Sequence, residues 1–396
     1  MGYLASQPVS MNIGFDAKRA FHNNTGLGNY SRTLINGLAR FYPDHKYFLF
    51  NPKPTEKYPK PGFANVFEIN PKTFLSKRFS SIWRSTWVKK DLQKLNIHLY
   101  HGLSHEIPMG INEIDIPSVV TIHDLIFEKY PKQFNRIDVE IYRKKFRYAC
   151  KYADRIIAIS KQTKNDIAQL YSIDEKKIDI CYQSCDPAFS IAVDASEKEK
   201  IRKKYDLPAS FFLYVGSIIE RKNLLNIVKA MLLLPKSVDI PLVVIGNGSD
   251  YKKQVETFIS QHHLNKKIIF LSEHTTVKND HAFQKPETLA AIYQLATALI
   301  YPSFYEGFGL PVLEALWSKT PVITSNVSCL PETGGNAAYY VNPSSTEEIA
   351  EAMKKVFEDE GLRNDMIKKG WEHAQNFTLE KCTASVMQVY KKITGV

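Results

Sequence analysis

Short apolar runs alternate with amphipathic stretches along most of the chain. Runs typical of β-strands in the first half are residues 11–16, 46–50, 66–69, 97–101, 118–123 and 155–160. Runs of the same kind in the second half are residues 211–216, 242–246, 267–271, 298–302, 321–325 and 337–341. Between them lie helical patterns, most clearly at residues 29–41, where apolar side chains recur with a period of about 3.6 residues. We therefore predict an α/β protein with two doubly wound, Rossmann-like domains.

The length favours the same division, because 396 residues are too many for one core of ordinary size. Residues 185–209 become polar and charged, and we place the domain boundary near residue 192. The N-terminal domain is then residues 1–191, of which residues 1–10 look like an extension or a tag remnant.

Composition excludes several classes of protein. No apolar run approaches the roughly 20 residues of a membrane span, and the first residues do not resemble a secretory signal. The five cysteines are an odd number without a CxxC pair, which favours a reducing cytoplasm and argues against a zinc site. The net charge of +11 is concentrated in residues 1–190, with 28 Lys and Arg against 18 Asp and Glu. Nucleic acid, an anionic membrane or an acidic substrate would each explain this excess.

Ligands of open α/β sheets bind beyond the carboxyl ends of the strands, so the loops there carry the candidate chemistry. Gly26 and Gly28 follow the first strand and would let backbone N–H groups approach a phosphate or sugar oxygen, although an ordinary flexible turn explains them equally well. His123 ends a later strand beside Asp124, where it could donate to a ligand or belong to a capping turn.

Two loops of the second half carry charge. Arg221 and Lys222 could neutralise a diphosphate, the alternative being a solvated pair of surface cations. Glu306 lies in a glycine-containing loop and Glu314 in the helix that follows, where each carboxylate could accept from paired hydroxyls, one pair on a sugar and one on a ribose. Backbone N–H groups at residues 308–310 would remain for phosphate oxygens. If Glu314 only complemented the helix dipole, Glu306 and the glycines would stay unexplained.

The order of these motifs resembles the family 4 retaining glycosyltransferases of the GT-B fold. The similarity extends from Met11 to Val396 through the segments TGLGNY, TIHDLIF, ADRIIAIS, VGSIIERKNL, YPSFYEGFGLPVLEA and LPETGGNAAYYVNP. Glu306 and Glu314 match the family's EX7E motif. The first of these segments, with HDLIF, is similar to mannosyltransferases of bacterial surface polysaccharide and lipopolysaccharide assembly.

The resemblance implies a cytoplasmic enzyme that moves mannose from GDP-mannose, its donor substrate, onto a saccharide or lipid-linked acceptor. In it, Glu306 would hold the donor sugar, Glu314 the ribose, and Arg221 with Lys222 the diphosphate, while His123 would lie beside the transferred sugar. The donor phosphate would also meet the backbone at the positions Gly26, Gly28, Phe308, Gly309 and Leu310. Neither a bound cofactor nor a metal is expected, because cationic side chains neutralise the leaving group.

Two segments depart from the family pattern. The long loop at residues 272–286 stands where the nucleotide base would lie, so a UDP-sugar donor of the glucosyl or N-acetylhexosaminyl kind stays open. Leu379 stands where Trp is common, although the helical pattern there is intact. The second domain would cover residues 192–375, and the helix at residues 376–396 should return to the N-terminal domain.

Other classes of protein explain less. A nucleotide-sugar epimerase or hydrolase of the same architecture would need further acid and base carboxylates, which the sequence does not reveal. A nucleic-acid partner is not expected, since no binding motif accompanies the basic half. Residues 72–94 carry seven Lys and Arg against one Asp, and a helix there would align Phe79, Trp83 and Trp87. That face could dock on an anionic membrane at the inner face of the plasma membrane, or the aromatic rings could pack into the core.

Overall fold

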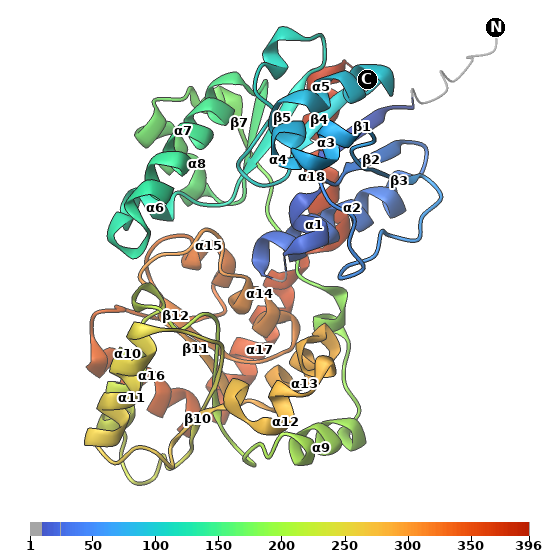
Figure 1. Ribbon diagram of the computed structural model, residues 1–396. Helices are drawn as coiled ribbons and strands as arrows, with labels where there is room; N and C mark the ends of the chain where they lie inside the picture. The colour runs from blue at the N-terminus through green and yellow to red at the C-terminus, as the bar shows by residue number, and fades with distance from the viewer. Residues whose placement is uncertain (1–9, 24, 396) are drawn as a thin grey trace, which may run out of the picture. The chain divides into compact units, whose positions relative to one another are not determined.

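The computed structural model describes residues 10–23 and 25–395, which form two compact units (Figure 1). The N-terminal unit contains the chain up to Ser184 and again from Thr378, and the C-terminal unit is Cys185–Phe377. Each unit is built on a parallel sheet, as the strand pattern predicts.

The sheet of the N-terminal unit is parallel throughout and has the spatial order β3-β2-β1-β4-β5-β6-β7. Its strands are β1 (Asn12–Asp16), β2 (Lys46–Phe50), β3 (Val66–Ile69), β4 (Leu99–Gly102), β5 (Ser118–Ile122), β6 (Arg155–Ala158) and β7 (Ile178–Ile180). Its helices are α1 (Lys18–His22), α2 (Gly26–Phe41), α3 (Phe74–Arg78), α4 (Ser80–Ile82), α5 (Val88–Lys94), α6 (Ile126–Lys129), α7 (Arg136–Tyr152), α8 (Lys161–Tyr171) and α18 (Leu379–Thr394). One hydrophobic core joins the sheet to α2 and α18, and another joins it to α5, α7 and α8.

The C-terminal unit repeats this plan with the order β10-β9-β8-β11-β12-β13. Its strands are β8 (Phe212–Val215), β9 (Leu242–Ile245), β10 (Ile268–Phe270), β11 (Ala298–Tyr301), β12 (Val322–Ser325) and β13 (Tyr339–Val341). Its helices are α9 (Ala195–Lys204), α10 (Leu224–Leu233), α11 (Asp250–Gln261), α12 (Thr275–Lys278), α13 (Pro286–Leu295), α14 (Leu310–Trp317), α15 (Leu330–Gly334), α16 (Thr346–Glu358) and α17 (Glu360–Ala374). The central strands β9, β11 and β12 are buried at every position, as expected when helices cover both faces of a parallel sheet.

The division between the units lies slightly before the boundary expected at residue 192. Residues 185–191 pack on the C-terminal unit, because a single 3₁₀ turn at Pro187–Ser190 contacts α13. The Phe189 ring meets the Tyr293 ring edge-on, with 5.7 Å between the centroids. The second crossing lies between Phe377 and Thr378 rather than between residues 375 and 376.

The segment 72–94 is not the single helix that the aromatic spacing predicts. It consists of α3, α4, a π-helical turn at Trp83–Trp87 and α5. The wider π turn changes the angular spacing of the side chains, so the three aromatic residues do not share one face. Trp83 is buried and donates from Nε1 to Asp91 at 2.7 Å, whereas Phe79 and Trp87 are exposed. The prediction of one aligned aromatic face was therefore wrong.

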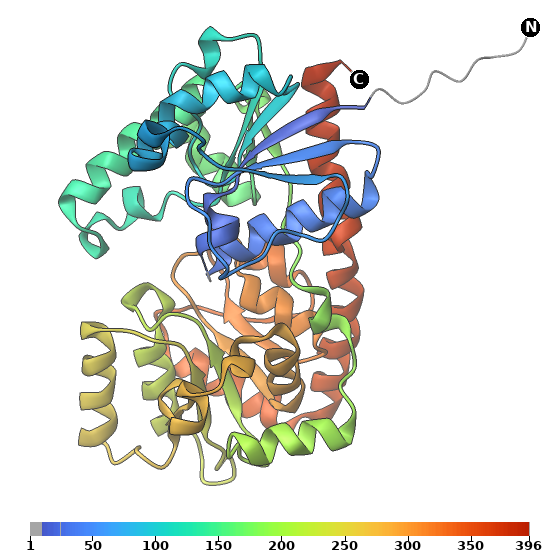
Figure 2. The same cartoon turned by 45° about the vertical axis from the view of Figure 1, so that its right-hand side comes forward.

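The last helix, α18, crosses and packs against α2 in the N-terminal unit (Figure 2). Gly37 permits this approach, because a Cβ atom there would lie 2.3 Å from Thr383 Oγ1 and 2.9 Å from Leu379 Cδ1. The Thr378 side chain accepts from the Lys381 N–H and so caps the start of α18.

We expect Gly37→Ala to lower the free energy of unfolding by about 1–3 kcal/mol, since the added methyl group overpacks this contact. Alanine is otherwise the better helix former by roughly 0.5–1 kcal/mol, so the sign of the change distinguishes the two effects. Urea unfolding measures it. Gly62→Ala is the matched control, because nothing lies within 4 Å of a Cβ atom at that position. Equal stability of both variants would show that α18 does not pack closely on Gly37.

Candidate functional site

The EX7E loop connects β11 to α14 and buries its first carboxylate. Glu306 is 8% exposed and lies 3.0 Å from Arg221 Nη1 and 3.5 Å from Lys222 Nζ. The Tyr301 hydroxyl donates to Glu306 Oε1 at 2.9 Å and accepts from Lys222 Nζ at 2.6 Å. The structure thus joins three of the predicted site residues in one buried cluster.

The charged groups of this cluster shift one another's pKa values. Burial opposes ionisation of Glu306, but Lys222 and Arg221 outweigh it, so the pKa of the carboxyl is lowered from its ordinary value. Burial likewise lowers the pKa of Lys222, and Arg221 adds to that effect while Glu306 opposes it. Two cations facing one anion leave a single positive charge, which is a suitable environment for a larger anion.

Local backbone geometry fixes the loop. Arg221 lies in a 3₁₀ turn after β8 and also donates to the Tyr305 carbonyl oxygen. Gly309 has a φ of +90°, and a Cβ there would lie 2.7 Å from Leu330 Cδ2, so this position requires glycine. Leu310 begins α14. Pro311 has no N–H group, and the Val312 N–H donates to the Gly309 carbonyl oxygen at 2.9 Å. Phe308 instead packs inward, 5.6 Å from the Phe377 ring.

Glu314 lies on α14 and is partly buried. Its Oε2 accepts from the Tyr293 hydroxyl at 2.8 Å. Burial raises the pKa of this carboxyl from 4.5 to about 7. Glu314 can therefore either accept or donate a hydrogen bond near neutral pH.

The glycines of the first loop have a structural explanation. Gly26 begins α2, and the Gly28 N–H already donates to Asn23 Oδ1 at 3.2 Å. A Cβ at Gly28 would lie 2.0 Å from the Asn23 carbonyl oxygen, so close backbone packing alone demands glycine there. The N–H group that we expected at a phosphate is therefore engaged within the chain.

His123 follows β5 and is enclosed in the N-terminal unit. It is 4% exposed, and its Nε2 donates to the Leu103 carbonyl oxygen at 2.9 Å. Burial lowers the pKa of its ring to about 4, so the ring is neutral at pH 7. Its own carbonyl accepts from Thr163 Oγ1 at 3.2 Å. Asp124 accepts from the Ile126 N–H, which matches the capping turn that the sequence left open.

Sequence reasoning missed a buried hydrogen-bonded chain behind His123. The Tyr30 ring meets the His123 ring edge-on at 4.6 Å, and the Tyr30 hydroxyl lies 3.0 Å from Thr121 Oγ1. Thr121 Oγ1 is 2.8 Å from His101 Nε2, and His101 Nδ1 is 2.5 Å from the Tyr390 hydroxyl on α18. The position of His101 near the end of β4 was the available signal, but the partner from α18 could not be inferred.

A second missed group lies in the EX7E loop itself. Ser303 is fully buried, and its hydroxyl has no hydrogen-bond partner in the part of the chain that the structure describes. Across the same residues, no three His, Cys, Asp or Glu side chains gather in a way that could hold a metal ion.

Comparison with known proteins places the chain among glycosyltransferases. The family model "Glycosyltransferase Family 4" matches residues 24–189, and "Glycosyl transferases group 1" matches residues 197–373. O-antigen chain mannosyltransferase B of Escherichia coli is 25% identical over 397 residues, which is 96% of this chain and all of that protein. O-antigen chain mannosyltransferase RfbU of Salmonella typhimurium is 29% identical over 64% of this chain and 63% of its own length.

Solved structures support the same fold. Anabaena HepE in complex with UDP-glucose is 14% identical and has a TM-score of 0.70, covering 96% of this chain and all of that protein. The predicted pair of Rossmann-like domains of the GT-B fold is therefore confirmed.

The pKa of Glu314 predicts a pH dependence of stability. The folded chain holds this proton more tightly than the unfolded chain, so unfolding releases it between pH 4.5 and about 7. The contribution of Glu314 to stability therefore falls as the pH rises through that window. We expect the free energy of unfolding of Glu314→Gln, relative to that of wild type, to rise by about 1–3 kcal/mol from pH 5 to pH 8. Urea unfolding at the two pH values measures it, and parallel pH profiles would contradict the raised pKa.

Proposed function

Because the chain belongs to the family 4 and group 1 glycosyltransferases, we propose that this hexosyltransferase moves mannose from GDP-mannose with retention of configuration. The acceptor is a saccharide or a lipid-linked saccharide of a surface polysaccharide. The relatives named as O-antigen mannosyltransferases support the choice of sugar and pathway.

The observation that carries this proposal is the buried cluster of Glu306, Arg221 and Lys222. Cleavage of a glycosyl phosphate leaves negative charge on the diphosphate, and fixed cations in a dry environment stabilise that charge strongly. Arg221 can bind phosphate oxygens through two N–H groups, while Lys222 acts as a point charge. Glu306 then accepts from hydroxyls of the sugar, and Glu314 from those of the ribose.

The remaining steps follow from charge development. Positive charge grows on the sugar ring as the bond to the diphosphate breaks, and an oxygen of the departing phosphate takes the proton of the acceptor hydroxyl. Attack on the face that the phosphate leaves retains the configuration. In the donor-bound enzyme, the backbone at residues 308–310 contributes further contacts to the donor. The cations perform the neutralisation that a metal performs in other transferases, so we propose metal independence.

The base of the nucleotide is the least constrained part of the donor. The loop at residues 272–286 is folded into short helical turns, and Asp280 accepts from the Tyr205 hydroxyl at 2.7 Å and pairs with Lys204 at 2.5 Å. In this proposal, the base packs against that loop. A UDP-sugar donor is the second candidate, since the HepE complex holds UDP-glucose.

A donor screen tests the assignment. With a mannose-terminated acceptor, we expect turnover with GDP-mannose, little with UDP-glucose, an α-linked product by NMR and full activity in EDTA. Glu306→Gln should lower kcat by about 100-fold or more, because the lost charge acts on the transition state. Glu351→Gln, on the exposed side of α16, is the control and should keep wild-type rates. A β-linked product would contradict retention, and an unaffected Glu306→Gln would remove Glu306 from the reaction.

We also propose that the segment 72–94 brings the enzyme to the inner face of the plasma membrane. Among the described residues, no helix has the length and apolar character needed to cross a bilayer. The segment does expose Phe74 (81%), Leu75 (60%) and Phe79 (46%), beside the exposed cations Lys77 and Arg78. Apolar side chains flanked by cations suit the interface of an anionic membrane.

Sedimentation with phosphatidylglycerol vesicles tests this surface. We expect wild type to bind at low salt, and Lys77→Glu with Arg78→Glu to bind at least tenfold more weakly, since each basic residue near the surface contributes roughly 1 kcal/mol. Lys236→Glu with Lys266→Glu changes the net charge equally on the C-terminal unit and is the control. Equal binding of both double variants would show that only overall charge matters, and failure of wild type to bind would favour a soluble acceptor.

A further inference from the structure

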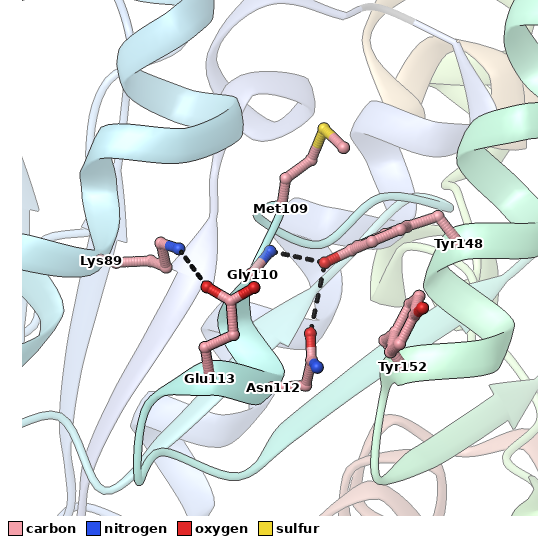
Figure 3. A pocket seen from close by; sticks show the side chains of 7 residues that line it. All are labelled: Lys89, Met109, Gly110, Asn112, Glu113, Tyr148 and Tyr152. Carbon is pink, nitrogen blue, oxygen red and sulfur yellow. Dashed lines mark hydrogen bonds and ion pairs between the residues drawn. The ribbon is translucent and has the colours of Figure 1, made fainter.

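An open pocket of about 310 Å³ lies in the N-terminal unit, outside the predicted site (Figure 3). Its lining residues come from α5, from the loop before β5 and from the C-terminal half of α7; they are Lys89, Met109, Gly110, Asn112, Glu113, Tyr148 and Tyr152. None of the residues that the family resemblance assigns to the reaction lines this pocket. Its size is at the lower end of small-ligand sites and suits one or two sugar rings.

The shape of the pocket is fixed by internal bonds. The Gly110 N–H donates to the Tyr148 hydroxyl at 2.5 Å, and that hydroxyl lies 3.4 Å from Asn112 Oδ1 (Figure 3). The Met109 N–H donates to the Ser85 carbonyl oxygen at 2.7 Å, which ties the loop to the π turn. A preformed pocket reduces the ordering cost that a weakly bound ligand would otherwise meet.

Only glycine fits at position 110, because the side chains of the polar side of the pocket lie close to its backbone. Its φ is +73°, and a Cβ there would lie 2.4 Å from Lys89 Nζ and 2.6 Å from Glu113 Oε2. The Lys89 ammonium and the Glu113 carboxylate are 3.6 Å apart and face one another across this glycine. Any other residue would push the pair apart and enter the pocket.

The lining is neutral overall although the unit around it is strongly basic. The Lys89 charge is balanced by Glu113, so the pocket offers donors and acceptors without a net attraction for anions. Tyr148 and Tyr152 place their rings 4.6 Å apart and add apolar surface with polar tips. Apolar ring faces combined with amide, carboxylate and ammonium groups match the C–H faces and hydroxyls of a neutral sugar.

We propose that this pocket is a second saccharide-binding site, which holds a neutral sugar unit of the acceptor glycan away from the reacting end. The sugar lies against the tyrosine rings, its hydroxyls donate to Glu113, and they accept from Lys89 and the Asn112 amide. The identity of the glycan rests on the proposed function, whereas the class of ligand follows from the pocket itself. A long acceptor is then held at two places, which lowers its KM relative to a short one.

Saturation-transfer NMR with an α-linked mannotriose, in the absence of any donor, tests the site on the full chain. We expect binding in the millimolar range, at least tenfold weaker in Tyr152→Ala and in Asn112→Ala. Tyr142→Ala removes a tyrosine from the same helix outside the pocket and is the matched control. Glu306→Gln should bind the trisaccharide as wild type does, and both pocket variants should bind GDP-mannose unchanged.

Kinetics give a second readout. Tyr152→Ala should raise KM for a long acceptor several-fold while leaving kcat and the rate on a monosaccharide acceptor unchanged. Trisaccharide binding that is equal in wild type, Tyr152→Ala and Asn112→Ala would overturn the proposal, as would binding abolished by glycerol phosphate at low salt, which would identify a lipid headgroup site. Retained trisaccharide binding without mannosyl transfer would instead contradict only the proposed donor.

Discussion

The buried charge of Glu306 is the constraint on which the C-terminal unit depends. A carboxylate in a protein interior is costly unless it is paired and hydrogen-bonded, and Arg221, Lys222 and Tyr301 supply those partners. These groups come from separate strand ends, so the parallel order of β8 and β11 is needed to bring them together. The sheet topology is therefore needed to form the charged cluster.

The N-terminal unit has a corresponding polar chain from α18 to His123. His101 has a pKa lowered by burial to about 3, so it is neutral and offers one donor and one acceptor to the two hydroxyls beside it. Loss of the Tyr390 hydroxyl would leave a buried ring nitrogen without its partner. The last helix is thus bound to the sheet by more than apolar packing, and it completes the surroundings of a residue far away in sequence.

The features predicted best from the sequence were the strands and helices that a local pattern of residues determines. Strands such as β9 and β12 were predicted from runs of apolar residues, and the helix that carries Glu314 was expected after the glycine-containing loop. β7 was missed, since Ile178–Ile180 is three residues long with a polar centre. The family motif assigned Glu306 and Arg221 to parts of one donor. Their ion pair was not predicted, because 85 residues separate them in the sequence.

The prediction of one aligned aromatic face failed because a local change of helix type altered the helical period. Trp83 and Trp87 stand at helical spacing, yet a π turn buries the first and exposes the second. The approach of the Gly28 backbone to a phosphate or sugar oxygen stays a prediction, and in this structure its N–H donates to Asn23 Oδ1. In both places, a residue nearby in the chain makes a hydrogen bond that the residue spacing does not reveal.

In the Glu306 cluster, burial disfavours the charged forms of both Glu306 and Lys222, and the ion pairs oppose that effect. With Glu306 ionised, the two cations are only partly neutralised, and burial with Arg221 lowers the pKa of Lys222. A diphosphate beside Lys222 would raise that pKa again, because an anion stabilises the charged amine. Glu306 therefore holds both cations in position, and a diphosphate bound there would add a second anion to the same two side chains.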